Sequence, residues 1–500
     1  MAVGPDAPGS SAGGISMNAK TERIAAPQGA RSDAIVAGAL VLVAFATRLW
    51  RLEAPNAIVW DESVIVSAAR CLAQHLPYRT THPPLEAMLV ALSIRLFGDQ
   101  PWSWRLPNAV VGSLLVGITY ILAKRMFDSR LAAALAAGFV ICDGLFFIDS
   151  RTAVWEILYL TSAAAAYLML FRFAQTFDRR EQRTALVWMG LALGLGLGSK
   201  LLIPIMVEML VLGFVIFILV RQAYSEQTNI VFPYAQIVSA TALVGGLTAF
   251  VYMLILLPNY WLGFWHGIID QLVYYREEWE FQKVQSALPH PYGSPWWSWP
   301  LMLRGLPYWT AKGFSLNSNA DVAVIRAISN PIICWGVTVS MPLVGIQAIA
   351  GKGWQRSFLI VGYLLYLAMW AVNPRYQFIY HYMPALYLGF LALAILLAEC
   401  WQGVAPFWQQ VALLFPLGPA LILGLGPKVG FVSALGIAVT YLALLRHGNE
   451  YSGKFVLAAF ALAALAAFVY FFPVWTGLPL SAAGFHARMW LHGRGLPNWT

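Results

Sequence analysis

The sequence predicts an all-α polytopic membrane protein, and three observations lead to this fold class. Of its 500 residues, 59% are hydrophobic and only 11% are charged, whereas a soluble domain carries about 25% charged residues. Apolar runs recur along the chain after a polar start, and about 20 apolar residues suffice for one membrane span. A single soluble core stops growing at roughly 250–300 residues, so no soluble architecture would bury this much apolar surface.

The apolar runs define the expected helices in order. We expect spans near residues 34–50, 106–123, 131–148, 153–172, 185–199, 201–220, 234–257, 327–349, 357–372, 378–399, 408–425, 427–446 and 454–473. The runs over 185–220 could form one kinked segment, and those over 408–446 could form one hairpin. The expected number of transmembrane helices is therefore about 11–13.

The segments between these runs set the domain organisation. Residues 1–33 are rich in Ala, Gly, Ser and Pro, a composition that cannot pack a core, so we expect a disordered tail there. Residues 34–500 are expected to form a single transmembrane domain with two long loops, at about 51–105 and 258–326. Lys and Arg collect in the loops after even-numbered spans, and such loops are cytoplasmic. The N-terminus is therefore expected in the cytoplasm, with both long loops and the C-terminus outside.

The net charge of +9 has the same explanation, because basic residues of membrane proteins collect in cytoplasmic loops. We therefore expect the lipid bilayer, and no nucleic acid, as a partner. Cys71, Cys142, Cys334 and Cys400 are scattered and form no CxxC pair, so the sequence predicts neither a zinc site nor a disulfide framework.

The first long loop contains polar residues suited to catalysis. Asp61 and Glu62 are adjacent carboxylates just outside the first span. They could be a solvated loop start, or one could act as general base while the other orients an acceptor or binds a cation. His82 stands before Pro83-Pro84, which predict the start of a short helix ending at Gly98. His82 could bond a phosphate or an acceptor, or have a structural role.

Charged residues also stand at the outer ends of later spans. Arg105 enters the second span from outside, where an arginine is costly unless it pairs with an anion. It is expected to pair with Asp61 or Glu62, to contact a lipid phosphate, or to reach the headgroups. Glu156 lies about one turn into the fourth span and needs a partner, and Lys200 is likewise flanked by apolar residues.

The second long loop is dense in aromatic residues over 290–300, including His290, Tyr292 and Trp297. Such a string suits a sugar or polyprenyl site, although aromatic residues also form belts at membrane interfaces. Further on, Arg375, Tyr380 and His381 are too polar for a lipid-facing surface and are expected to point inward.

Together these motifs resemble those of the dolichyl- or polyprenyl-phosphate-mannose protein O-mannosyltransferases of prokaryotic type. The matching strings are Asp61-Glu62, His82-Pro83-Pro84-Leu85, Trp104-Arg105-Leu106, Ser150-Arg151 with Glu156, the His290–Pro300 string and Tyr380-His381-Tyr382-x-Pro384. The resemblance covers roughly residues 34–500. Two features depart from it: the family usually has Leu-Asp at Trp155-Glu156, and it usually has eleven spans, so an excess is expected around 408–446.

The resemblance implies a glycosyltransferase C-type fold in the plasma membrane. It implies inverting transfer of mannose from polyprenyl-phosphate mannose to Ser or Thr hydroxyls of proteins at the extracytoplasmic face, with the acceptor delivered by the secretion machinery as one route. The implied catalytic residues are Asp61 as base and Glu62, which positions the acceptor or supports the network. The implied ligands of the donor phosphate are Arg105 and Arg375, then Arg151 and Lys200. The implied substrate-binding residues are His82, Glu156, His290, Tyr292, Trp297, Tyr380 and His381. No metal cofactor is required, although the two carboxylates could hold a divalent cation.

Two alternatives remain open on the sequence alone. The same fold could transfer a sugar to lipid A or to a cell-envelope glycan, because the Asp-Glu and His-Pro-Pro-Leu features fit both acceptors. A transporter also carries intramembrane charges, but its charges should lie near mid-bilayer on broken helices in symmetric halves. Here the charges gather at the outer ends of spans, which favours the enzyme.

Overall fold

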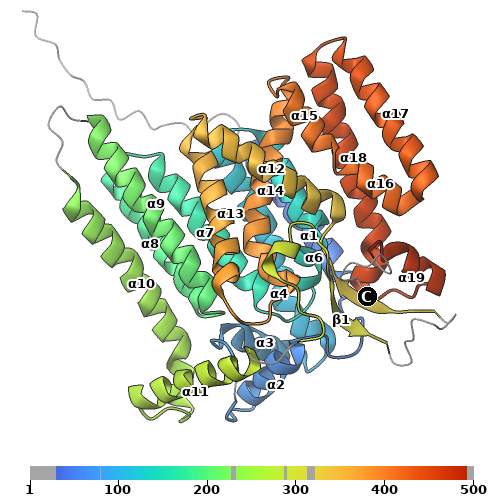
Figure 1. Cartoon of the computed structure of the whole chain (residues 1–500). Coiled ribbons are helices and arrows are strands. Elements are labelled where there is room, and N and C mark those ends of the chain that lie inside the picture. Colours follow the sequence, from blue (N-terminus) through green and yellow to red (C-terminus); the bar gives the residue numbers. More distant parts are fainter. Residues whose placement is uncertain (1–29, 79, 227–231, 287–289, 312–320, 492–500) are drawn as a thin grey trace, which may run out of the picture.

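The structure is a computed structural model, and it describes residues 30–78, 80–226, 232–286, 290–311 and 321–491. Within these residues, eleven helices are long and apolar enough to cross a membrane. They are α1 (Ala30–Leu49), α4 (Pro101–Phe127), α7 (Glu156–Ala174), α9 (Leu202–Glu226), α10 (Tyr234–Trp261), α12 (Pro331–Ile349), α13 (Trp354–Val372), α14 (Met383–Trp401), the pair α15 (Phe407–Leu414) and α16 (Leu417–Leu425), α17 (Pro427–Leu445) and α18 (Asn449–Thr476). The expected range of 11–13 spans is confirmed at its lower end, and the helices form one bundle (Figure 1).

Two of the thirteen expected spans do not meet this description. The run at 131–148 is divided into α5 (Arg130–Cys142) and α6 (Gly144–Asp149), because the Asp143 carboxylate caps α6 by accepting the backbone N–H groups of Leu145 and Phe146. The run at 185–199 belongs to α8 (Arg179–Leu197), whose first turns are rich in arginine. Both segments are helical, but one is too short and the other too polar at its start.

The excess of spans expected around 408–446 is wrong, because both runs there qualify as spans. Helices α16 and α17 pack against each other as a hairpin that turns at Gly426, which has a φ of +83°. A Cβ atom at Gly430 would lie 2.4 Å from the carbonyl oxygen of Leu421. Glycine at this position therefore lets the two helices approach closely.

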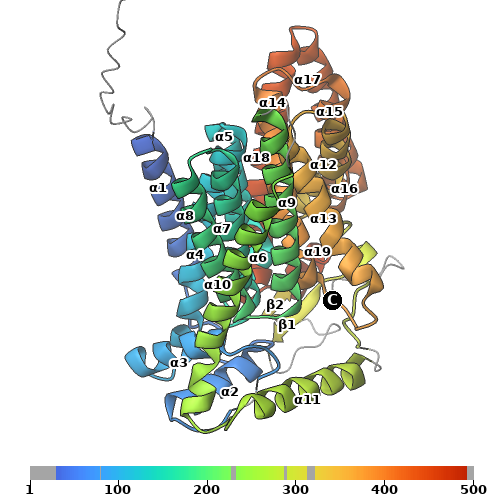
Figure 2. The same ribbon diagram turned by 90° about the vertical axis from the view of Figure 1, so that its left-hand side faces the viewer.

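The remaining elements gather at one end of the bundle, opposite the start of α1 (Figures 1 and 2). They are α2 (Glu62–Ala73), α3 (Leu85–Phe97), α11 (Ile268–Ser286), the 3₁₀ turns η1 (Trp296–Ser298) and η2 (Ile379–Tyr382), β1 (Leu306–Thr310), β2 (Val324–Ala327) and α19 (Ala482–Arg488). The short helix predicted to end at Gly98 is α3, and Gly98 follows it with a φ of +87°. Both predicted long loops therefore meet at the same end.

A small sheet at this end departs from the all-α prediction. Strand β1 pairs antiparallel with β2, with Leu306 opposite Ala327 and an irregularity between Pro307 and Trp309. The strands have five and four residues. Strands this short leave little alternation in the sequence, and proline within a run argues against a strand.

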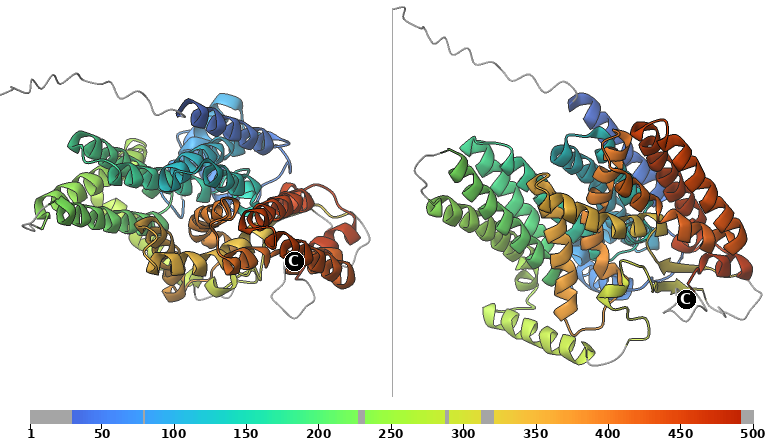
Figure 3. Two further views of the ribbon diagram at one scale, coloured as in Figure 1. Left: turned by 90° about the horizontal axis from the view of Figure 1, so that it is seen from above. Right: turned by 45° about the horizontal axis from the view of Figure 1, so that its top comes forward.

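The bundle has a buried centre and two flanks. Helix α14 is apolar around its whole circumference and is fully buried over its most apolar 18 residues, as expected for a helix without a polar face. Helices α8–α10 lie on one side of the bundle and α15–α18 on the other (Figure 3). Of the tail predicted over 1–33, residues 1–29 lie outside the described residues, and residues 30–33 belong to α1.

Candidate functional site

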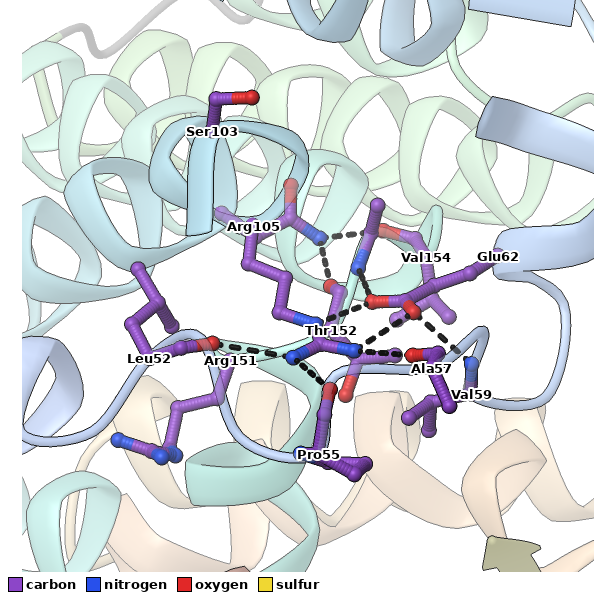
Figure 4. Close-up of polar contacts among 12 residues, drawn as sticks. Leu52, Pro55, Ala57, Val59, Glu62, Ser103, Arg105, Arg151, Thr152 and Val154 are labelled. Atoms are coloured by element: carbon purple, nitrogen blue, oxygen red, sulfur yellow. Dashed lines mark hydrogen bonds and ion pairs between the residues drawn. The ribbon is translucent and has the colours of Figure 1, made fainter. Parts of the chain in front are cut away.

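Glu62, the first residue of α2, forms a buried ion pair with Arg105 in the first turns of α4. Arg105 Nε donates to Oε1 at 2.8 Å and Nη2 donates to Oε2 at 3.0 Å. The backbone N–H groups of Val59 and Ala153 donate to the same carboxylate at 2.9 and 3.2 Å. Glu62 and Arg105 are 0% and 1% exposed, so four protein donors satisfy this carboxylate out of contact with solvent (Figure 4).

The rest of the Arg105 guanidinium also binds the protein. Nη1 donates to the carbonyls of Leu52 and Pro55, both at 3.0 Å, and Nη2 donates to the carbonyl of Ala57 at 2.8 Å. These contacts engage all five N–H groups of the arginine. Of the roles that the sequence left open for Arg105, the structure shows the pair with Glu62.

Arg151 holds the end of α1. Its guanidinium donates to the carbonyls of Thr47, Arg48, Trp50 and Arg51 at 2.6–3.3 Å. The last carbonyls of a helix lack intrahelical partners and attract positive charge, so Arg151 acts as a cap. Its expected role in phosphate binding is not supported by this geometry. We refer to Glu62, Arg105 and Arg151 as the closed cluster.

Asp61, by contrast, has no hydrogen bond from its carboxylate to any described residue and is half-buried. Burial raises the pKa of Asp61 to about 6; the nearby charge of Glu156 also raises it, while Lys200 and Arg375 lower it. These four residues therefore share one electrostatic environment, although they come from distant parts of the chain. We refer to Asp61, Glu156, Lys200 and Arg375 as the open cluster.

The backbone before Asp61 is strained and held by stacking. Trp60 has a φ of +46°, which is rare for a bulky residue. Its ring lies parallel to that of Tyr308 with centroids 5.7 Å apart, and its backbone N–H donates to the Tyr308 carbonyl at 3.1 Å. Strained backbone persists only where the surroundings fix it, so β1 holds the direction in which Asp61 points.

The cations of the open cluster differ from those of the closed cluster. Lys200, just before α9, contacts the Glu156 carboxylate at 2.6 Å, and both side chains are buried. The Lys200 ammonium also faces the ring of Tyr380 at 5.4 Å. Arg375 has no acceptor for its guanidinium among the described side chains and carbonyls, and its Nε is buried without a partner. An anion placed here would therefore meet unused N–H groups.

The predicted histidines have different surroundings. His82 packs edge-on against Trp155 with centroids 4.6 Å apart. Burial, together with the charges of Lys200 and Arg375, lowers the pKa of His82 well below its usual value, so its ring is neutral. His381 is buried, stacks on Trp370 and accepts the backbone N–H of Phe378 at 3.1 Å, which is a structural role.

The aromatic residues of the second loop include buried side chains that hold the loop together and exposed side chains on its surface. Trp299 is buried, and its indole N–H donates to Ser294. His290 lies edge-on to Trp60 at 6.3 Å, next to the site. Tyr292 and Trp297 are 38% and 55% exposed, and their contact with substrate stays a prediction.

Two buried carboxyl groups near the open cluster received no role from the sequence. Asp149 accepts the Tyr308 hydroxyl at 3.0 Å through one oxygen, while its second oxygen has no partner. Both oxygens of Glu86 are buried without a partner. Burial and the charge of Glu156 raise the pKa of each carboxyl well above its usual value. A carboxylate in the first turn of an apolar helix was the signal that could have identified Glu86.

No group of three or more His, Cys, Asp or Glu side chains is arranged to hold a metal ion within the described ranges. The open cluster offers a carboxylate with a raised pKa beside two cations: Lys200, which is paired with Glu156, and Arg375, whose guanidinium has no acceptor among the described residues. Such a set can remove a proton from a hydroxyl while a leaving anion is stabilised.

Two family models match the chain in succession. The model described as dolichyl-phosphate-mannose-protein mannosyltransferase matches residues 38–275. The model described as the C-terminal four TMM region of protein-O-mannosyltransferase matches residues 272–494. Together the two models span 38–494, which includes both long loops and all the expected site residues.

Curated relatives match most of the chain. Polyprenol-phosphate-mannose–protein mannosyltransferase of Mycolicibacterium smegmatis is 24% identical over 471 residues, which cover 84% of this chain and 81% of the relative. The protein of that name from Mycobacterium tuberculosis is 22% identical over 478 residues, which cover 84% and 80%. The similarity therefore extends over most of this chain and most of each relative.

Solved structures show the same fold. A chain of the S. cerevisiae protein O-mannosyltransferase Pmt1-Pmt2 complex, bound to the sugar donor, matches with a TM-score of 0.71 at 14% identity and covers 92% of each chain. ArnT from Cupriavidus metallidurans in the apo state matches with a TM-score of 0.53 at 13% identity, covering 90% of this chain and 78% of that chain. The expected glycosyltransferase C-type fold is therefore confirmed.

Proposed function

The chain belongs to the protein O-mannosyltransferase family, and from this premise we propose that it transfers mannose, with inversion, from polyprenyl-phosphate mannose to Ser or Thr hydroxyls of proteins. The observation that carries the proposal is the open cluster, where the Asp61 carboxylate has no hydrogen-bond partner among the described residues and stands near Arg375, whose guanidinium has no acceptor there either. Relatives that match over most of the chain carry the name of this activity.

In the proposed reaction, Asp61 is the general base. A hydroxyl is a weak nucleophile and needs a base within hydrogen-bond reach. The Asp61 carboxylate has no competing donor among the described residues, so it is free to accept the proton of an incoming Ser or Thr. A pKa of about 6 leaves it ionised at neutral pH and more basic than an ordinary aspartate.

Arg375 and Lys200 stabilise the leaving group. Cleavage of the sugar–phosphate bond leaves additional negative charge on the lipid phosphate, and fixed donors stabilise developing charge best. Arg375 offers unused guanidinium N–H groups. Lys200 is held by Glu156 and retains donors for a second anion. Because these cations supply the positive charge, the proposed reaction needs no metal ion.

Glu62 supports the site as a positioning residue. Its carboxylate is saturated by Arg105 and two backbone N–H groups, so it does not contact the acceptor. It fixes the turn that carries Asp61. Of the two roles expected for Glu62, support of the network is the one that the geometry favours.

The proposed setting is the plasma membrane. Helices α2, α3 and α11, which belong to the two long loops, lie at the end of the bundle opposite the start of α1 (Figures 1 and 2). Asp61 immediately precedes α2, and the basic loops favour a cytoplasmic N-terminus. The site and the C-terminus would then be extracytoplasmic. Protein acceptors would arrive unfolded from the secretion machinery, which delivers them at that face.

The test is sugar transfer by the purified protein from synthetic polyprenyl-phosphate mannose to a Ser/Thr-rich peptide, with and without EDTA. We expect labelled mannose in the peptide in both conditions. Label that appears only in added lipid A or envelope glycan would replace the protein acceptor with that alternative. A folded protein that neither transfers nor hydrolyses the donor would refute the proposed activity.

A further inference from the structure

Helix α11 exposes apolar side chains although it is not a membrane span. Within the described residues, it is not among the eleven helices that are long and apolar enough to cross a membrane. It runs across the end of the bundle instead (Figure 2). Ile268, Leu272 and Trp279 are nevertheless 56–65% exposed. Exposed apolar patches mark surfaces that contact a partner or a membrane, so the surroundings of α11 have to show which of these it meets.

The hydrogen bonds of α11 place it beside the last turns of α10. The hydroxyl groups of Tyr275 and Tyr252 are hydrogen-bonded to each other, and the Tyr260 hydroxyl donates to the side chain of Gln271 at 2.5 Å. Tyr252 lies nine residues before Trp261, the last residue of α10, which is a rise of about 14 Å. Helix α11 is therefore level with the final third of a membrane span.

The outer surface of α10 meets lipid at this depth. With 28 residues, α10 is about 42 Å long, and a bilayer with its headgroups is about 40–45 Å thick. Its last turns therefore lie where hydrocarbon gives way to headgroups. Phe250 and Leu254, two residues on either side of Tyr252, are exposed, as lipid-facing side chains of a span are. The exposed side chains of α11 continue this surface at the same level.

Three exposed apolar residues of α11 lie on one side of the helix. They fall within about 40° of one another at 3.6 residues per turn, and we refer to them as the apolar stripe: Ile268, Leu272 and Trp279. Tyr275 lies about 20° from Ile268 and reaches Tyr252. Gln271 lies about 40° farther from the stripe and reaches Tyr260, nearer the end of α10. The apolar stripe is therefore on the side of α11 that is turned toward the inside of the bilayer.

The charged residues of α11 follow the same division. Arg276 and Lys283 border the apolar stripe, about 20–40° beyond Leu272. Long basic side chains lay their stems along apolar surface and keep their charges at the headgroups. Asp270 and Glu277 lie on the opposite side, about 160–180° from the centre of the stripe. This distribution, with a tryptophan in the stripe, is typical of a helix that lies in a membrane interface.

The side of α11 that faces away from the apolar stripe holds the first long loop. The Tyr274 hydroxyl donates to the carbonyl of Thr80, and the Thr80 hydroxyl donates to the carbonyl of His82. His82 packs against Trp155, and the Lys200 ammonium faces the same indole ring at 6.0 Å. Two hydrogen bonds therefore connect α11 with residues that adjoin the open cluster.

We propose that α11 is an interfacial membrane helix whose apolar stripe inserts into the bilayer leaflet at this end of the bundle, and that this contact with lipid fixes the segment from Thr80 to His82 beside the open cluster. The partner is the bilayer itself, because the stripe is level with the last turns of a span and continues its lipid-facing surface. The placement of α11 goes beyond the proposed function and does not depend on the sugar or the acceptor.

The first experiment measures the depth of α11 with a nitroxide spin label, in nanodiscs of phosphatidylethanolamine and phosphatidylglycerol. The label is attached to Leu272→Cys or, as the matched control, to Phe281→Cys, because Phe281 is exposed on the opposite side of the same helix. Cys71 and Cys142, the two cysteines that are not buried, are first replaced by serine. Apolar solutes concentrate in apolar surroundings, so oxygen should relax the label at position 272 about threefold more than a water-soluble nickel chelate does. The order should be reversed at position 281.

The second experiment tests the link to the site with Leu272→Glu and its control Phe281→Glu. A carboxylate is expelled from the apolar layer, which would pull Tyr274 away from Thr80. Because small misplacements near a reaction centre are costly, we expect mannose transfer by Leu272→Glu in nanodiscs to fall about tenfold or more. Phe281→Glu should transfer as fast as the wild type. Size-exclusion chromatography and the melting temperature show whether each variant is folded.

The two experiments decide the two parts of the inference separately. Protection of the label from nickel at position 272 alone, with loss of transfer in Leu272→Glu alone, would support both. Equal access of the nickel chelate to both labels would overturn the placement in the membrane. A protected label at position 272 with unchanged transfer by Leu272→Glu would overturn the link to the open cluster. The label measurement needs no reaction, so it decides the placement of α11 even if the wild type transferred no mannose.

Discussion

The closed and open clusters lie side by side but differ in how the protein uses their charges. In the closed cluster, every N–H group of Arg105 and both oxygens of Glu62 have protein partners. In the open cluster, the Asp61 carboxylate has no partner among the described residues, and Nε of Arg375 is buried without one. The two acids are adjacent in sequence, yet their surroundings are opposite.

This difference indicates which cluster is scaffold and which is site. An unsatisfied buried polar group costs about 1–3 kcal/mol, so such groups are few in native proteins and require an explanation. Nε of Arg375 is such a group, and a substrate anion that supplies the missing partner is the explanation we adopt for it. The half-buried Asp61 carboxylate is likewise open to a substrate hydroxyl. Fully satisfied charges such as Glu62 and Arg105 instead fix the geometry around them.

The largest effect is expected from Asp61→Asn. Removing the base should lower the transfer rate by roughly 10²–10⁴-fold, measured with labelled donor and a Thr peptide. Folding should not suffer: the pKa of Asp61 is about 6 in the folded protein against 3.8 for the free side chain. Ionisation between these values therefore costs stability as the pH rises, and asparagine avoids that cost.

The matched control for this variant is Asp128→Asn, because Asp128 is a highly exposed aspartate that pairs with Lys124 after α4. It should leave the transfer rate unchanged. A melting temperature that falls in Asp61→Asn, together with residual activity near that of the wild type, would assign Asp61 to the scaffold and erase the distinction between the clusters.

The next effect concerns stability and belongs to the closed cluster. Glu62→Gln leaves the buried Arg105 charge without its counterion and should cost about 3–5 kcal/mol of unfolding free energy. Glu450→Gln makes the same change in an exposed pair with Lys454 and should cost about 0–1 kcal/mol. Thermal unfolding in detergent measures both, and equal shifts in the two variants would contradict the assignment of Glu62 as scaffold.

The helical bundle could be predicted from the sequence, and the candidate residues Asp61, Glu156, Lys200 and Arg375 that it singled out share one environment in the structure. Apolar runs follow from composition alone, and α3 was predicted from Pro83-Pro84 and Gly98. The strands β1 and β2 could not be predicted, because both are short and the segment that joins them, residues 311–323, is longer than the turns by which a hairpin is recognised. The division of one apolar run into α5 and α6 depends on the Asp143 side chain, which caps α6. Hydrophobic periodicity does not reveal such a cap.

Individual roles within the site were harder to predict than its location. A sequence shows that Arg105 and Arg151 are arginines near a membrane boundary, and a phosphate was one suitable partner. It does not show that the carbonyls of Leu52 and Thr47 would reach them first. Whether a buried arginine keeps N–H groups available for a substrate depends on which backbone carbonyls accept them. Those carbonyls are distant in the sequence and come close to the arginine only in the folded chain.

A smaller effect is expected from Arg375→Gln, which acts on donor binding. Hydrogen bonds to charged groups contribute about 1.5–3 kcal/mol, so the KM for the polyprenyl donor should rise roughly 10–100-fold while the acceptor KM stays the same. Arg446→Gln, after the C-terminus of α17, serves as the control. An acceptor KM that rises as much as the donor KM would place Arg375 outside the phosphate site.

The smallest effect is a shift in pH dependence, and it separates the two clusters most directly. The kcat/KM for the acceptor should rise with pH through about 6, because only ionised Asp61 accepts a proton. Glu156 raises the pKa of Asp61, whereas Lys200 and Arg375 lower it. Glu156→Gln removes the raising charge and leaves the two cations in place, so the acidic limb of the profile should move to lower pH.

Glu62→Gln provides the comparison for that shift. Glu62 is next to Asp61 in the chain, but its charge is compensated by Arg105 at 2.8 Å, and it is not among the charges that move the pKa of Asp61. The limb should therefore stay in place in the folded fraction of Glu62→Gln. If the acidic limb moved as far in Glu62→Gln as in Glu156→Gln, charges of both clusters would set the pKa of Asp61. The assignment of Glu62 to the scaffold and of Asp61 to the site would then be wrong.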